Sequence, residues 1–187
     1  MNGGRPYRRE SEMYPVVANW LARALRGIYP RTRVDTYDTS RMFLNRFLER
    51  EGLQQLFPDF QTYEIQVDLT AVIRPRKHPA TLGFVECKLG QISLRDLSQL
   101  LGYSRVTLPV YSIIVSPVGM TRGLHYLLNT LSRIDVLQYA ENRRIKVATW
   151  DAVREEISFP TLIPPWRLCV TPCCPVHWSR ARLNEEP

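Results

Sequence analysis

The chain has 187 residues, of which 44% are hydrophobic and 10% aromatic, and this composition excludes an intrinsically disordered protein. Its formal net charge of +7 favours a polyanionic partner, with nucleic acid as the first expectation and an anionic membrane surface as the second. No apolar run approaches the length of a membrane span, and the N-terminus lacks the apolar core of a signal peptide. We therefore expect a cytoplasmic protein without a membrane partner.

Two helices and a short strand are predicted in the first third of the chain. Apolar residues at helical spacing, Tyr14 among them, indicate a helix over residues 10–29. A weak alternation of apolar and polar residues indicates a short strand over 31–38. A second helix is expected over 40–57, where phenylalanine and leucine recur on one side and a proline follows.

Two strands joined by a basic loop are predicted next. Residues 63–73 alternate between apolar and polar, which indicates a strand with one apolar face and with Asp68 on the other. Residues 82–90 indicate a buried strand in which Glu86 and Lys88 share one face. Antiparallel pairing about the loop would set Asp68 close to opposite Glu86.

Helices and strands alternate in the prediction for the following residues. A helix over 93–105 opens with a capping box, formed by a serine and an aspartate three residues later. Strands are expected over 110–115 and 144–150, a long helix over 121–140, and a last helical turn or two over 151–157. This order predicts an α/β domain whose mixed central β-sheet is flanked by helices on both faces.

Asp68, Glu86 and Lys88 can converge at the open end of the predicted hairpin. Two carboxylates with room for waters suit Mg²⁺ or Mn²⁺, and the carbonyl of Cys87 offers a third oxygen ligand. A lysine beside such an ion could orient or deprotonate an attacking water, or neutralise charge that builds on a phosphate. This arrangement indicates hydrolysis of phosphodiester bonds. The alternative is a cluster of ion pairs at the strand ends with no metal.

The order of these residues resembles the PD-(D/E)XK nuclease superfamily, in which an acid on one strand is followed by Glu-x-Lys on the next and then by a helix. The matching segments are Val67-Asp68-Leu69, Val85-Glu86-Cys87-Lys88 and Ser98-Gln99-Leu100-Leu101-Gly102-Tyr103. The resemblance covers residues 10–150 and implies a restriction-endonuclease-like fold with an αβββαβ core. It also implies DNA cleavage that depends on Mg²⁺ or Mn²⁺ held by Asp68, Glu86 and the Cys87 carbonyl. The proline that usually precedes the first acid is Val67 here.

Supporting residues are implied by the same resemblance. Members often use a Gln or a Tyr on the helix after Glu-x-Lys, which matches Gln99 and Tyr103. A Glu on the first helix often joins the metal ligands, which matches Glu12 or Glu10. From the residues alone, Gln99 and Tyr103 are equally compatible with a hydrogen bond between the helix and a neighbouring strand. The two glutamates are compatible with simple capping of the first helix.

The last part of the chain differs in composition, being rich in proline and cysteine. We therefore divide the sequence into a nuclease-like domain, residues 1–158, and a C-terminal tail, residues 159–187. Four soft ligands within nine residues of this tail invite a zinc site: Cys169, Cys173, Cys174 and His177. The paired Cys-x-x-Cys of a zinc knuckle is absent, so a plain tail with reactive thiols is the alternative.

Basic residues are expected to line a phosphate track in three groups: Arg5, Arg8 and Arg9; the loop residues Arg74, Arg76 and Lys77; and Arg41, Arg95 and Arg105. Only three of the 25 basic residues are lysines, and arginine suits bidentate phosphate contacts. The alternatives are genome composition for the arginine bias and an ordinary solvated surface for each group.

The sequence thus predicts a Mg-dependent nuclease acting on DNA, in the first place an endonuclease, with Asp68 and Glu86 binding the metal and Lys88 positioning the attacking water. Two alternatives stay open: a non-catalytic nucleic-acid-binding or scaffold protein that keeps the fold, and an enzyme of the same fold that acts on RNA. Cutting both strands of a duplex takes two sites, which is compatible with a homodimer. An unidentified protein partner is compatible with the sequence as well.

Overall fold

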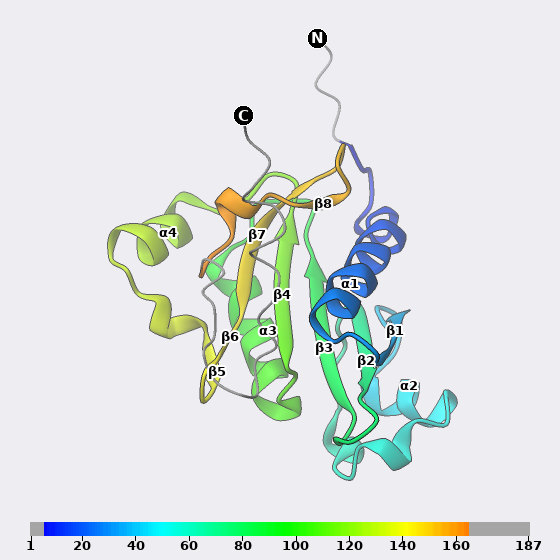
Figure 1. The fold of residues 1–187 in the computed structure, drawn as a ribbon. Coiled ribbons are helices and arrows are strands. Elements are labelled where there is room, and N and C mark those ends of the chain that lie inside the picture. The colour runs from blue at the N-terminus through cyan, green and yellow to red at the C-terminus, as the bar shows by residue number, and fades with distance from the viewer. Residues whose placement is uncertain (1–5, 165–187) are drawn as a thin grey trace.

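A mixed six-stranded β-sheet runs through the middle of the computed structural model, which describes residues 6–164 (Figure 1). Its strand order is β1-β2-β3-β4-β7-β8. The first three strands pair antiparallel, β4 and β7 run parallel to β3, and β8 returns antiparallel. The strands are β1 (Arg33–Asp38), β2 (Leu69–Arg74), β3 (Thr81–Cys87), β4 (Tyr111–Ser116), β7 (Lys146–Asp151) and β8 (Glu156–Ile157). The predicted α/β class and mixed sheet are confirmed.

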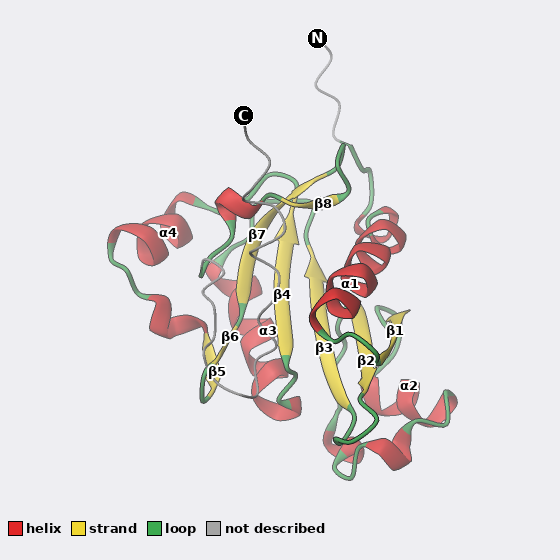
Figure 2. Cartoon of the chain, viewed as in Figure 1, coloured by secondary structure: helices red, strands yellow, loops and turns green. Residues whose placement is uncertain are grey.

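Helices cover both faces of this sheet, as predicted (Figure 2). One face is covered by α1, which follows a short 3-10 helix, and the other by α2, α3 and α4. A π-helical turn continues α4. The helices are the 3-10 helix Glu10–Glu12, α1 (Tyr14–Ile28), α2 (Leu44–Arg50), α3 (Leu94–Thr107), α4 (Arg122–His125) and the π-helix Tyr126–Thr130.

The alternation of side chains along β3 places hydrophobic groups in both layers of the core. Phe84 packs on the side of α3, whereas Val85 and Cys87 pack on the side of α1. Every residue of β4 is buried, because this strand has neighbours on both edges and helices on both faces. The sheet therefore fixes the face on which each residue of β3 is presented.

The helix expected over 40–57 is wrong in its extent, because only Leu44–Arg50 forms α2. Gly52 adopts a φ of +65°, which a helix cannot continue through, and a 3-10 turn at Gln54–Leu56 follows. The apolar residues after the break still pack in the core, since Leu53 and Phe57 are both buried. Their spacing matched a helix although the backbone turns.

The strand expected over 63–73 is also shorter, because β2 begins only at Leu69. Tyr63 and Ile65 are buried and alternate with exposed neighbours, which is the pattern that predicted a strand. Their carbonyls instead accept hydrogen bonds from Asn45 and Leu44 at the start of α2, at 3.1 and 2.8 Å. The segment is extended, so its side chains alternate as in a strand. Its hydrogen bonds go to the start of α2 and not to a neighbouring strand.

Two predictions toward the end of the chain are wrong. The long helix expected over 121–140 stops at the π-helical turn, and Ser132, at a φ of +53°, breaks it. A two-stranded hairpin, β5 (Gln138–Ala140) and β6 (Arg143–Arg144), follows. The helical turns expected over 151–157 are instead a tight turn from β7 into β8, with Glu155 at a φ of +52°.

Residues 159–164 at the start of the proline-rich segment pack against the sheet. Ile163 exchanges backbone hydrogen bonds with Val147 at 2.7 and 2.8 Å, and Leu162 is buried. The four candidate zinc ligands lie outside the described residues: Cys169, Cys173, Cys174 and His177. Within residues 6–164, no helix combines the length and the apolar character needed to cross a membrane.

Candidate metal and nuclease site

The predicted acidic residues lie at one end of the β2–β3 hairpin. β2 and β3 pair antiparallel with Leu69 opposite Val85, and the same register continued by one residue sets Asp68 opposite Glu86. The antiparallel pairing predicted from the sequence is confirmed. The loop 74–80 that joins the two strands lies at the other end of the hairpin. Asp68 and Glu86, together called the acids below, therefore lie where β3 ends and the chain turns toward α3.

Glu86 and Lys88 form a salt bridge at the end of β3. The Lys88 ammonium donates to Glu86 Oε1 at 2.9 Å, and the Lys88 backbone N–H donates to the carbonyl of Val115 at 2.9 Å. Glu86 is only 4% exposed. Its second oxygen, Oε2, is buried without a hydrogen-bond partner in the described part of the chain. An unpaired carboxylate oxygen is costly to bury, so this atom favours a cation or a proton beside it.

Asp68 is held by hydrogen bonds to both of its carboxylate oxygens. The phenol of Tyr14 donates to Oδ1 at 2.8 Å, and the backbone N–H of Cys87 donates to Oδ2 at 2.8 Å. The main chain is held too, because the Thr39 N–H donates to the Asp68 carbonyl at 2.9 Å and the Thr39 hydroxyl to the Val67 carbonyl at 2.7 Å. Two donors, from α1 and β3, thus fix the carboxylate, and two groups of Thr39 fix the main chain beside it.

Sequence reasoning missed Tyr14, which it counted only as an apolar residue of the first helix. The residue is buried, and a buried tyrosine hydroxyl needs a hydrogen-bond partner. Burial and the hydrogen bond to Asp68 raise the pKa of this phenol well above its ordinary value, so it remains a donor at neutral pH. A tyrosine on the inward face of the helix was therefore a signal of a polar group beneath it.

Electrostatics at the site are dominated by two buried carboxylates. Burial and the charge of Asp68 raise the pKa of Glu86 to about 7, against the attraction of Lys88. Burial also raises the pKa of Asp68, against the hydrogen bonds from Cys87 and Tyr14. Burial opposes the charge of Lys88, but its interactions with Glu86 outweigh that effect and raise the Lys88 pKa. The ammonium is therefore protonated at neutral pH, and a cation between the carboxylates would relieve their repulsion.

The first-helix glutamate at this site is Glu10, not Glu12. Glu10 accepts a hydrogen bond from the backbone N–H of Leu89 at 3.3 Å, and its charge acts on Asp68 and Lys88. Glu12 accepts from the backbone N–H of Arg8 at 2.8 Å on the exposed side of the turn. The structure thus brings the alternative glutamate to the acids, because the chain before α1 forms a 3-10 turn that a helical spacing does not describe.

Gln99 and Tyr103 lie together on α3, as their spacing predicted, and are hydrogen-bonded to each other. The Gln99 amide donates to the Tyr103 hydroxyl at 3.1 Å in an exposed position, and neither bonds Asp68, Glu86 or Lys88 within residues 6–164. The start of α3 is closer to the site. Its predicted capping box is confirmed, since Ser93 and Asp96 bond each other reciprocally. Burial opposes the ionisation of Asp96, but the hydrogen bonds from Ser93 outweigh it and lower the Asp96 pKa. The charge of Lys88 lowers this pKa further, which shows that Lys88 lies near the start of α3.

A divalent metal ion fits the donor set at the end of the hairpin. Residues 6–164 contain no group of three or more His, Cys, Asp or Glu side chains placed to share an ion. Magnesium, however, is usually bound through only one or two carboxylates and keeps several waters. Asp68 and Glu86 supply two carboxylates, the Cys87 carbonyl is adjacent, and Glu86 Oε2 is a buried oxygen without a partner. Each bonded oxygen of Asp68 also retains a second acceptor position.

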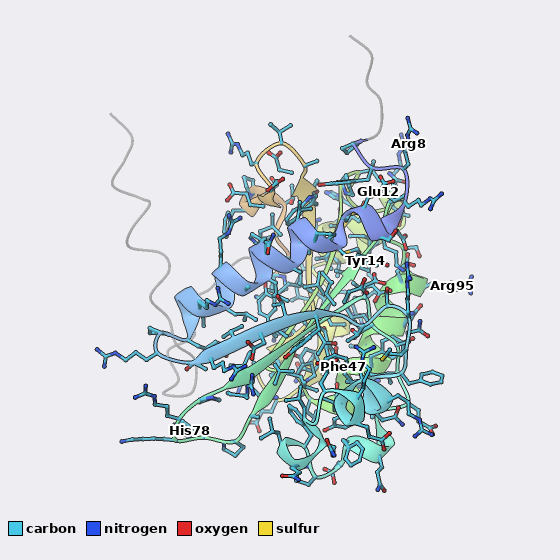
Figure 3. All side chains as sticks on the ribbon, turned by 90° about the vertical axis from the view of Figure 1, so that its right-hand side faces the viewer. Arg8, Glu12, Tyr14, Phe47, His78 and Arg95 are labelled. Atoms are coloured by element: carbon cyan, nitrogen blue, oxygen red, sulfur yellow. The ribbon has the colours of Figure 1, made fainter. Side chains whose placement is uncertain are left out.

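Of the basic residues predicted to form one phosphate track, those of the hairpin loop lie at a different end of the molecule from Arg8 and Arg95 (Figure 3), and Arg5 lies outside the described residues. Figure 3 shows Arg8 and Arg95 on the side of Tyr14, and His78 of the hairpin loop on the opposite side. The seven residues of β3 separate the loop from the acids by roughly 20 Å. Arg74 instead forms an ion pair with Asp35 of β1. The loop is therefore not part of a track at the acids.

Comparison of the chain with known protein families, with characterised proteins and with solved structures found no match. The function is therefore inferred from the order of the elements, from the three residues Asp68, Glu86 and Lys88, and from the groups that hold them.

Proposed function

We propose that this chain is a metal-dependent nuclease of the PD-(D/E)XK superfamily, with a restriction-endonuclease-like fold, that hydrolyses DNA phosphodiester bonds as an endonuclease. Support comes from the order α1, β1, β2, β3, α3, β4, into which α2 is inserted after β1. The observation that carries the proposal is the buried, unpartnered Oε2 of Glu86 beside the protonated Lys88 and opposite the fixed Asp68.

Mg²⁺ or Mn²⁺ would be held by Asp68, Glu86 and the carbonyl of Cys87. Such an ion supplies a Lewis acid that polarises a phosphate oxygen and lowers the pKa of a bound water. The remaining work belongs to the chain. Tyr14 and the Cys87 N–H orient Asp68 and favour its charged form against the effect of burial, because both donate to the carboxylate.

Lys88 acts as a charged hydrogen-bond donor in this proposal. Its ammonium is fixed by Glu86 at 2.9 Å and is partly buried, and its raised pKa keeps the proton in place at neutral pH. A protonated lysine cannot accept a proton from water, so we assign it to positioning the attacking water and to neutralising charge on the phosphate. Glu10 adds negative charge behind this ammonium and further favours its protonated form.

The alternative function is a nucleic-acid-binding or scaffold protein that keeps the nuclease fold without catalysis. The observation in its favour is that residues 6–164 hold no group of three metal-ligating side chains. In that case the Glu86–Lys88 pair would be a structural ion pair. The nuclease proposal includes DNA as the substrate, a cytoplasmic location and a homodimer that cuts both strands.

The test is cleavage of linear, circular, single-stranded and branched DNA, and of an RNA of matched sequence, with Mg²⁺, Mn²⁺ or EDTA. Wild type is compared with Glu86→Ala, with Lys88→Ala and with Lys77→Ala, which removes the same charge from the distant loop. We expect metal-dependent cutting of DNA that is lost in the first two variants and kept in the third. If every form binds DNA tightly and none cuts it, the enzyme proposal fails and the nucleic-acid-binding protein is favoured instead. If only RNA is cut, the proposed substrate is RNA and not DNA.

A further inference from the structure

Tyr14 connects α1 to Asp68, the first of the two carboxylates of the predicted metal site. The residue begins α1 and is 8% exposed, with its ring packed in the hydrophobic layer between α1 and the sheet. From this position its phenol donates to Asp68 Oδ1 at 2.8 Å across 54 residues of sequence. A ring fixed in a close-packed layer has few alternative rotamers. The hydroxyl is consequently held at a defined point in space.

The two donors to Asp68 come from separate elements and bind separate oxygens. The Cys87 N–H approaches Oδ2 from β3, whereas Tyr14 approaches Oδ1 from α1. A carboxylate with one donor on each oxygen cannot rotate about its last torsion without breaking a bond. Each oxygen also keeps one acceptor position, which points away from its donor. The carboxylate is therefore set in one orientation before any ligand arrives.

We propose that Tyr14 is a positioning residue that orients Asp68 to bind the divalent cation of the site. The inference deepens the proposed function and depends on it. Groups that donate a hydrogen bond to a metal-binding side chain, without binding the metal themselves, fix the orientation of that side chain. Their removal typically lowers metal affinity or activity by about 10–100-fold. Tyr14 donates to one oxygen of Asp68 and leaves the other to the backbone, so its loss frees the carboxylate to rotate.

The variant Tyr14→Phe removes the hydroxyl and keeps the ring. A matched control is Tyr139→Phe, because Tyr139 is also buried and donates to the Pro109 carbonyl at 2.8 Å, far from the acids. Both variants lose one hydrogen bond of 2.8 Å donated by a buried tyrosine. Mn²⁺ affinity is measured by isothermal titration on wild type and on both variants without DNA, and circular dichroism shows that each is folded at the temperature used.

The expected result is that Tyr14→Phe weakens Mn²⁺ binding by about 10–100-fold, whereas Tyr139→Phe leaves it within about twofold of wild type. At saturating Mn²⁺ the DNA cleavage rate of Tyr14→Phe should recover most of its loss, which a general structural defect would not allow. Equal Mn²⁺ affinity in the two variants would overturn the role of Tyr14 while leaving the nuclease in place. A wild-type chain that binds no Mn²⁺ would overturn the proposed function and this inference together.

If Tyr14→Phe does not fold, Thr39→Val provides a second route, because Thr39 fixes the main chain beside Asp68 through its hydroxyl rather than the carboxylate. Its Mn²⁺ affinity should fall less than tenfold if the orientation of the carboxylate itself is what matters, since both donors to the carboxylate remain in place. A larger loss would show that the carboxylate is positioned through its backbone, and the proposal would fail.

Discussion

Replacing Glu86 by glutamine should make the metal-free protein less sensitive to rising pH. Burial and Asp68 raise the pKa of Glu86 from 4.5 to about 7 in the folded state. A carboxyl whose pKa is higher when folded stabilises the fold fully below its unfolded pKa, and this contribution is lost as the pH rises through the folded value. A shift of this size is worth about 3 kcal/mol. The glutamine amide does not ionise in this pH range, so the variant lacks this contribution to the pH dependence of stability.

The assay is urea unfolding of wild type and Glu86→Gln in EDTA at pH 4, below the unfolded pKa of this carboxyl, and at pH 8, above its folded pKa. Relative to wild type, the variant should gain about 3 kcal/mol in free energy of unfolding between the two conditions. Glu64→Gln, at an exposed glutamate, serves as the control and should track wild type. If wild type and Glu86→Gln lose stability in parallel as the pH rises, Glu86 does not have the raised pKa on which this prediction depends.

Adding Mg²⁺ should stabilise wild type and have little effect on Glu86→Gln. A ligand that binds only the folded state adds about 2.7 kcal/mol at a hundred times its dissociation constant. Wild type should gain this stability at pH 8, because both carboxylates are available, whereas Glu86→Gln should gain little. Equal stabilisation of the two proteins by Mg²⁺ would place the ion elsewhere.

Three further predictions concern α3 and strand β1. Gln99→Ala should leave DNA cleavage within about threefold of wild type, because the exposed Gln99 bonds Tyr103 and not the acids; a larger loss with an unchanged melting temperature would return this residue to the site. Ser93→Ala should lower the free energy of unfolding by about 1 kcal/mol in urea titrations, since it removes the cap of α3, and an unchanged midpoint would contradict this. Burial opposes the ionisation of Asp35, but the bonds from Arg74 and Arg33 lower its pKa, so its stabilising effect is lost only as the pH falls through that lowered value. Asp35→Asn should therefore reduce the loss of melting temperature below about pH 4, and an acid transition identical to wild type would exclude the effect.

The parts of the fold that the sequence predicted best are those where local chemistry and tertiary packing agree. The strand β3 alternates between two buried faces, and its partner β2 is joined to it by a short loop, so the register followed from the position of the loop. The start of α3 was predictable because the Ser93–Asp96 capping box is a local motif.

The failures share a physical cause, which is that apolar spacing reports burial and not backbone conformation. Tyr63 and Ile65 alternate like a strand but bond the start of α2. The leucines beyond residue 121 recur like a helix, yet Ser132 turns the chain and Leu137 is buried at the start of a hairpin. In the first region the hydrogen-bond partners lie about 20 residues away in the sequence, and in the second a positive φ at Ser132 turns the chain, so apolar spacing alone predicted neither conformation.

At the site, the sequence predicted the charged groups and missed the group that orients them. Asp68, Glu86 and Lys88 stand out because charges at the end of apolar strands are costly. The hydrogen bond from Tyr14 depends on the packing of α1 across the sheet, 54 residues away in sequence. The choice of Glu10 over Glu12 likewise depends on a 3-10 turn rather than on the number of residues between them.

The most direct test of the central claim is a crystal of the full chain soaked in Mn²⁺ and measured for anomalous scattering. We expect one peak between the carboxylates of Asp68 and Glu86, close to the carbonyl of Cys87, that is absent from crystals of Glu86→Gln. A wild-type crystal with no peak there, and with Glu86 still bound to Lys88 alone, would contradict the metal site and with it the proposed nuclease.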